Sequence, residues 1–335
     1  MNMFMPAYVV QYFHVKWFVR DQDWTPQGLS HIITPTFLFW LVFTMSVLLI
    51  TSILDPKIEK IGFVHKTHLF LDKLKRYQFP ILRIGVGIGL LLQLVTGTYL
   101  APTLVPAHWG VYVLLVIAIL GLLHQRTLII SGAAITTLYI IAIMTYGLFH
   151  MLDYMFYIGI IYYLLAANTK WHAASATMLY FFTGVSLAWL AMEKLTLAKL
   201  ACSLMHEYGI ASLGFTVEDF VLISAFIEMA LAWAFIAGIM NRFTALMLTG
   251  LFLTTTAIFG ITEIIGHAIV HTLLIVFLVG GREDRTTLFR FFKKPIIRHL
   301  VFTFSFAVLL FGLMIPYIWM GQPGNGFVIT YNPFL

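Results

Sequence analysis

Ten runs of mostly apolar residues, several of them long enough to cross a lipid bilayer, dominate this chain. A spanning helix needs about 20 predominantly apolar residues, with about 17 as a practical minimum. The bilayer core offers the backbone no water, so a spanning segment must satisfy its own hydrogen bonds, as a helix does. The sequence therefore predicts an all-α polytopic membrane protein with about ten transmembrane helices. The predicted spans cover residues 32–54, 81–100, 111–123, 128–148, 152–167, 174–193, 220–238, 243–260, 264–279 and 299–320.

Composition supports a membrane protein. Hydrophobic residues make up 61% of the 335 residues and charged residues only 10%, whereas soluble domains are nearer half apolar and a quarter charged. The net charge of +6 does not indicate a nucleic-acid partner, because the basic residues cluster in loops between apolar runs, where they set topology. Cys202 is the only cysteine, which excludes an intrachain disulfide and a paired-cysteine redox site within this chain.

Lysine and arginine predict the orientation of the spans. Two loops, residues 55–80 and 281–298, hold most of these cations, so we expect both loops on the cytoplasmic side. Counting spans then places Arg126, Lys170 and Arg242 on the same side, with Lys194 and Lys199 as exceptions on the other. Both termini are expected to be extracytoplasmic, in the cell membrane. Residues 1–30 lack the features of a cleavable signal peptide and predict an interfacial helix.

The middle of the chain is predicted to hold two copies of one four-span unit, residues 81–170 and 171–281. Each copy has a basic turn, a helix ending near a glycine (Gly147 or Gly260), and a further helix. Four spans return the chain to its starting side, so the copies should be parallel bundles. One helix flanks them at each end, within residues 31–80 and 282–335, the latter ending in an outer tail.

The second unit resembles the DoxX-like family of four-helix membrane proteins. The resemblance covers residues 180–281 and rests on Glu193 with Lys194, on Glu228 within a helix, and on the turn from Gly238 to Arg242. It implies a four-helix fold and a role beside redox or metal-handling partners, since the family includes a membrane subunit of thiosulfate:quinone oxidoreductase. The first unit departs from the pattern, so any site is expected to lie in the second unit alone.

The segment GITEIIGHAIVH places Glu263, His267 and His271 four residues apart, so they line one stripe of a helix. Ionisable groups in a bilayer cost at least ~2.5 kcal/mol each at mid-helix and persist by facing the bundle interior. We therefore expect this stripe to face inward, within reach of Glu228. His206 and Glu207, in the next outer loop, are weaker candidates. His150 and Asp153 in the first unit are expected at the membrane interface.

Three functions remain open. Histidine with carboxylate can bind a transition metal ion, which would suit a carrier or chaperone in metal handling, with Glu228, Glu263, His267 and His271 as candidate ligands. The same groups suit a quinone contact in a membrane subunit of a redox complex, with other membrane or extracytoplasmic subunits as partners. They also suit a structural anchor in which polar groups only hold helices together. Soluble-type catalytic motifs are absent from the sequence.

Overall fold

The computed structural model describes residues 25–280 and 294–327, and within these ranges the fold is built from helices, without a strand. Each of the ten predicted apolar runs coincides with a helix, and the all-α prediction is confirmed. The helices are α1 (Leu29–Ile32), α2 (Pro35–Ile58), α3 (Gly62–Leu74), α4 (Gln78–Thr96), α5 (Trp109–Gly121), α6 (Leu128–Tyr146), α7 (Leu148–Met151), α8 (Phe156–Ala166), α9 (Ser175–Thr196), α10 (Ala198–Glu207), α11 (Val217–Ala237), α12 (Asn241–Phe259), α13 (Ile261–Val279) and α14 (Pro295–Met320).

The number of full-length spans is smaller than the number of apolar runs. Eight helical segments in the described part of the chain are long and apolar enough to cross a membrane, or nine if α7 and α8 count as one broken span. At 1.5 Å per residue, the 13 residues of α5 reach about 20 Å, which is short of a hydrocarbon core of about 30 Å. The helices α7 and α8 are bent by 67° relative to each other. The two short runs of the sequence thus correspond to a short helix, α5, and to the bent helix pair of α7 and α8.

Local sequence sets several helix ends. Thr34 and Thr216 precede α2 and α11, and each side-chain oxygen accepts a hydrogen bond from a first-turn backbone N–H, at 3.1 Å in both cases. Such caps satisfy donors that have no partner inside the helix. At the other end of α11, Gly238 takes a left-handed conformation with φ of 72°, which glycine adopts without steric penalty.

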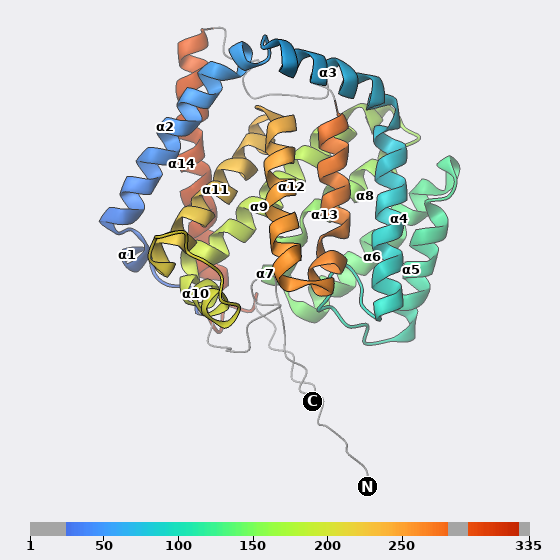
Figure 1. Cartoon of the computed structure of the whole chain (residues 1–335). Helices are drawn as coiled ribbons and strands as arrows, with labels where there is room; N and C mark the ends of the chain where they lie inside the picture. Colours follow the sequence, from blue (N-terminus) through green and yellow to red (C-terminus); the bar gives the residue numbers. More distant parts are fainter. Residues whose placement is uncertain (1–24, 281–293, 328–335) are drawn as a thin grey trace.

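The helices of the two predicted units form one ring rather than two separated bundles. The helices follow one another around the ring in the order α4, α5, α6, α8, α9, α11, α12 and α13. Each packs against the next, and α13 packs against α4. The units therefore meet twice, at α8 with α9 and at α13 with α4. Helices α2 and α14 pack on each other and against α9 and α11, outside this ring (Figure 1).

The first helices of the two units begin at the same end of the molecule, as a parallel repeat requires. Gly280, just after α13, lies against Gln78 at the start of α4. Near the start of α9, the Tyr180 hydroxyl donates a hydrogen bond of 3.1 Å to the carbonyl oxygen of Phe277. We call this the basic end, because α3 and the turn that holds Arg242 also lie there, and we call the other the opposite end.

Small residues let neighbouring helices approach closely in the ring. A Cβ atom on Gly184 of α9 would lie 2.9 Å from the carbonyl oxygen of Ala232 in α11, and one on Gly121 of α5 would lie 2.8 Å from the backbone nitrogen of Ser131 in α6. Lipid chains are as apolar as the helices, so association depends on close packing rather than on hydrophobic burial. These glycines thus position the helices that carry the polar residues.

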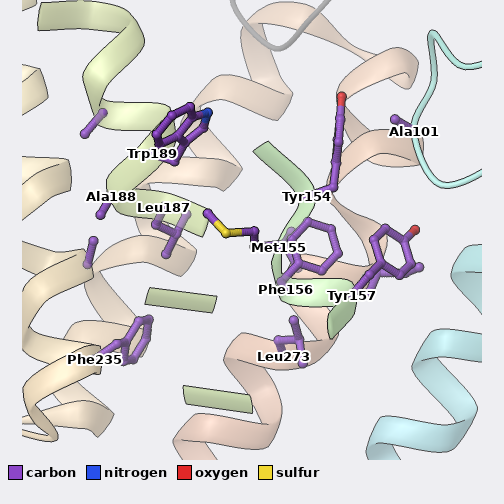
Figure 2. Close-up of a cluster of buried hydrophobic side chains, with 14 of the residues drawn as sticks. Ala101, Tyr154, Met155, Phe156, Tyr157, Leu187, Ala188, Trp189, Phe235 and Leu273 are labelled. Atoms are coloured by element: carbon purple, nitrogen blue, oxygen red, sulfur yellow. The ribbon is translucent and has the colours of Figure 1, made fainter. Parts of the chain in front are cut away.

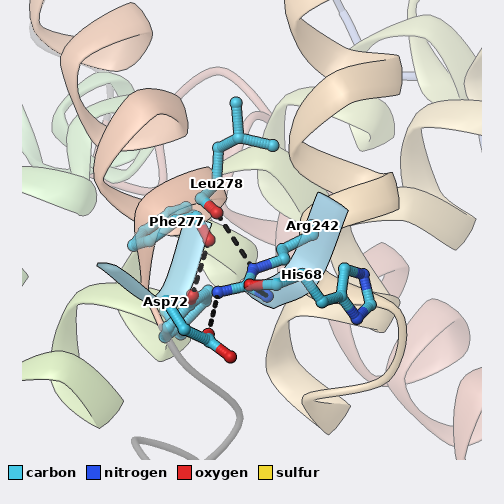
Figure 3. A network of polar contacts seen from close by, with 6 residues as sticks. His68, Asp72, Arg242, Phe277 and Leu278 are labelled. Atoms are coloured by element: carbon cyan, nitrogen blue, oxygen red, sulfur yellow. Dashed lines mark hydrogen bonds and ion pairs between the residues drawn. The ribbon is translucent and has the colours of Figure 1, made fainter. Parts of the chain in front are cut away.

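Helix α3 lies across the basic end and is held there by Arg242 (Figure 1). The guanidinium donates hydrogen bonds to the carbonyl oxygens of Leu278 (3.1 Å) and His68 (3.3 Å) and forms an ion pair of 2.6 Å with Asp72 (Figure 3). One side chain from α12 therefore joins α13 to α3. A planar guanidinium with five donors suits this geometry.

Arg242→Ala is expected to loosen α3 while leaving the ring folded. Three contacts disappear, and because the Asp72 side chain is 52% exposed, its ion pair contributes little of the loss. We expect hydrogen exchange across residues 62–74 to accelerate about tenfold, which corresponds to roughly 1.4 kcal/mol. Hydrogen–deuterium exchange with mass spectrometry measures this. Arg126→Ala, at the exposed turn of the first unit, is the control, and equal exchange in both variants would contradict the assigned role.

Candidate functional site

The stripe predicted on α13 faces the interior at two of its three positions. Glu263 and His267 are 3% and 2% exposed, and His267 Nδ1 lies 3.2 Å from Glu263 Oε1. Glu263 is in the first turn of α13, where the helix dipole favours a negative charge. The inward orientation is confirmed for these two residues, whereas His271 is half-buried.

An aromatic ring from α12 positions both histidines. Phe252 stacks on His267 with ring centres 4.6 Å apart and meets His271 edge-on at 6.1 Å. The imidazole of His267 is therefore fixed between a carboxylate and an aromatic face. Such a ring has few free rotations, which suits a group that must keep its orientation.

Glu228 pairs with a lysine instead of joining the histidines. Lys194 Nζ lies 2.8 Å from Glu228 Oε2, and the two side chains are 17% and 19% exposed. The pair joins α9 to α11. Of the four residues proposed as metal ligands, Glu263 and His267 thus contact each other, whereas Glu228 forms its ion pair with Lys194.

The remaining predicted ligands also lie apart. His206 and Glu207 are exposed at the end of α10. Across the described residues, no three His, Cys, Asp or Glu side chains are grouped so that they could hold a metal ion. The metal site remains a prediction that rests on residue types and spacing alone.

The first unit contributes buried ionisable groups that were expected at the membrane interface. His150 and Asp153 are each 3% exposed, so protein surrounds both side chains, and their place at the membrane interface stays a prediction. They lie on α7 and the turn after it, where the break before α8 carries the chain into the bundle. There Ser186 donates a hydrogen bond to the backbone oxygen of Asp153, and Tyr139 donates one of 2.6 Å to that of Met151. Irregular backbone at membrane depth is tolerated where protein surrounds it.

Ser186 shows how deep this broken segment lies. It occupies the middle of α9, so the backbone of Asp153 lies beside the middle of that helix rather than beside its end. The surrounding core is aromatic, and Figure 2 shows Met155 reaching toward Leu187 beside Tyr154 and Phe156. The sequence signal for this burial was present: Gly147 interrupts an apolar run, and two ionisable residues follow it within six positions.

A small cavity lies where the two units meet. It has a volume of about 20 Å³, and Asp153 of the first unit and His267 of the second both line it, together with Thr183 and Ser186 of α9. The Thr183 hydroxyl is buried and has no hydrogen-bond partner among the described residues. A site of this size with several polar partners can hold one water molecule, but it is too small for an aromatic head group.

Glu193 extends the buried polar groups toward α14. It is 2% exposed and lies one turn after Trp189 on α9, and Tyr317 of α14 is fully buried. Trp189 packs on the Tyr317 ring at 4.8 Å. In the described part of the chain, five Asp, Glu and His residues are at most 3% exposed, and we call them the central polar cluster: His150, Asp153, Glu193, Glu263 and His267. The cluster draws on both units, so the prediction that the site lies in the second unit alone is not supported.

Comparison with known proteins adds no relative. The chain matches no protein-family model, no curated protein and no solved structure. The resemblance to the DoxX-like family therefore stays a prediction.

Proposed function

We propose that this chain is an integral membrane subunit of a redox complex, in which the central polar cluster exchanges protons with a quinone or a redox partner subunit. The observation that supports this most is the burial of five ionisable side chains from both units, two of which, Asp153 and His267, line a cavity of water size. Ionisable groups inside a membrane are costly and commonly mark proton or ion pathways.

The composition of the cluster favours proton exchange over a purely structural role. Serine, threonine or asparagine would join helices by hydrogen bonds at lower desolvation cost than carboxylates. Histidine and carboxylate instead can take up and release protons in the physiological range. Reduction of a quinone to a quinol consumes two electrons and two protons, so a buried proton donor beside the electron source serves this chemistry.

The cavity limits where the acceptor binds. Its volume of about 20 Å³ admits water and excludes a quinone ring, so the ring binds at the margin of the cluster, and water carries the proton inside. A metal-handling role has less support, because no group of ligands is assembled in the described residues.

The proposal includes an orientation, with the basic end in the cytoplasm and the cluster in the outer half of the membrane. We expect Lys73→Cys in α3 to resist a membrane-impermeant maleimide in sealed cells and Asn325→Cys, after α14, to react. Both variants carry Cys202→Ser, although burial raises the pKa of the Cys202 thiol and slows its reaction. Gel-shift labelling measures the reaction, and permeabilised cells are the control for reactivity. Labelling of Lys73→Cys in sealed cells would reverse the orientation.

Isolation of the chain from native membranes in a mild detergent tests the function. We expect a subunit with a redox cofactor, seen in the reduced-minus-oxidised spectrum, or bound quinone at about one per chain after solvent extraction. In that complex, Asp153→Asn and His267→Gln should slow quinol-coupled turnover about a hundredfold or more, the size of a general acid–base contribution.

Glu228→Gln, which changes an acidic residue outside the cluster, is the matched control and should preserve most of the turnover. A chain isolated without quinone or redox partner would overturn the proposal. Elemental analysis of the same sample separates the alternatives, because a stoichiometric transition metal lost in His267→Gln would support metal handling. If neither quinone, partner nor metal is found, the structural role remains.

A further inference from the structure

A second, larger cavity lies at the basic end, away from the central polar cluster. It has a volume of about 830 Å³ and is bounded by the end of α2, one face of α3 and the first turns of α12. This volume is within the usual range for small-molecule sites, about 300–1,000 Å³. The Arg242 contacts with His68 and Asp72 form part of its wall (Figure 3), so the side chain that holds α3 in place also shapes this space.

The cavity wall is divided between charged and apolar side chains. Lys60 at the end of α2 and Lys75 after α3 contribute cations, with His65 and His68 between them. Phe243, Leu246 and Leu278, from α12 and α13, form an apolar wall. Phe243 and Leu246 are 49% and 58% exposed, so this wall continues onto the lipid-facing surface of α12. A ligand that fits both parts has a charged head and an apolar tail.

The position of the cavity identifies the kind of amphiphile. It lies where α2 ends and α12 begins, which is the level of the lipid head groups if these helices span the membrane. Further cations surround it on the exposed surface, at Lys57, Lys66, Lys73 and Arg76. Basic pockets between transmembrane helices on the cytoplasmic side bind phospholipid head groups, and each lysine near the surface favours anionic lipid.

We propose that this cavity binds a phospholipid of the adjacent leaflet. The phosphate lies against Lys75, and the acyl chains run along Phe243 and Leu246 into the bilayer. Asp55 and Glu59 also line the cavity, so a strongly anionic head group with several phosphates fits less well than one with a single phosphate. The lipid occupies the space between α3 and α12 and stabilises the position that α3 takes across the basic end.

Native mass spectrometry of the full, delipidated chain in a neutral detergent tests this proposal. Three probes separate the parts of the ligand: dioleoyl phosphatidylglycerol, dioleoylglycerol without a phosphate, and inorganic phosphate without a chain. We expect phosphatidylglycerol to bind with one molecule per chain and the other two to bind at least tenfold more weakly. Equal binding of dioleoylglycerol would overturn the role of the phosphate and of Lys75, and equal binding of inorganic phosphate would overturn the lipid as ligand.

Two lysine variants near the end of α3 supply the matched control. Lys75→Ala should weaken phosphatidylglycerol about fivefold, the effect expected from one lysine–phosphate contact. Lys73→Ala removes the same charge from a position that does not line the cavity and should change binding less than twofold. Equal loss in both variants would show general surface attraction and overturn the site.

A third variant blocks the cavity without changing charge. Thr67 lines it from α3 and is exposed, so Thr67→Trp places a large ring inside while the helix remains intact. We expect the loss of both phosphatidylglycerol and residual dioleoylglycerol binding. Thermal unfolding of each variant in detergent shows that the fold persists. Unchanged lipid binding in a folded Thr67→Trp chain would place the lipid elsewhere and contradict the proposal.

Discussion

His267→Ala is expected to destabilise the folded chain by about 3–5 kcal/mol. The imidazole lies 3.2 Å from the Glu263 carboxylate, and both side chains are at most 4% exposed. Removal of one partner leaves a buried charge uncompensated, which costs more than the pair contributed. The same change opens space beside Phe252, whose ring stacks on the imidazole. Unfolding in detergent micelles, followed by tryptophan fluorescence against denaturant, measures the loss.

His271→Ala, one helical turn further along α13, is the matched control. Its ring is half-buried and meets Phe252 only edge-on, so we expect a loss below about 1.5 kcal/mol. Replacing Glu263 and His267 together should cost less than the sum of the single changes, because neither partner is then left behind. If His267→Ala costs no more than His271→Ala, the Glu263–His267 pair does not stabilise the fold.

Gly184→Ala is expected to destabilise the chain by about 1–3 kcal/mol, although it adds a single methyl group. The new Cβ would lie 2.9 Å from the carbonyl oxygen of Ala232 and 2.6 Å from the Ile236 side chain. Backbone cannot move aside as a side chain does, so α9 and α11 must separate. Because α9 also carries Glu193 and Ser186, we expect the separation to reduce turnover of the isolated complex as well.

Gly250→Ala provides the comparison within the same type of element. Gly250 lies in the middle of α12 and is exposed, and a Cβ atom added there would meet no other atom within 4 Å. Alanine at this position should be neutral or stabilising by up to about 1 kcal/mol, because glycine weakens a helix interior. Thermal unfolding of both variants distinguishes close packing from helix propensity. Equal stability of the two variants would show that the α9–α11 contact tolerates separation.

Local pattern was sufficient to place the helices. Each apolar run of the sequence coincides with a helix, because inside a bilayer every backbone donor must find a partner within its own segment. The same reasoning placed Glu263 and His267 on the inner face of α13, since an outward charge would be too costly. Both results depend on periodicity and solvation, which are properties of a single segment.

The pairing of helices was not visible in any single segment. Two similar four-helix units predict two bundles, yet α4 packs on α13 and α8 on α9, and the units join in one ring. Apolar residues on a lipid-facing helix and on a packed helix look alike in composition. Which faces meet is decided by the close approach of small residues such as Gly89 against Ile269, and this depends on partners distant in sequence.

The sequence by itself determined the membrane class, the helical segments and the inward face of α13, because the cost of exposing polar groups to lipid acts on each segment separately. Only the tertiary structure decided the composition of the central polar cluster. It paired Glu228 with Lys194 rather than with the histidines, and it brought Asp153 beside the same cavity as His267. The physical reason is the bend of 67° between α7 and α8. It places Asp153, which the sequence pattern assigns to the end of a helix, in the interior of the protein. Such a bend depends on contacts with α6 and α9 that form only in the folded chain.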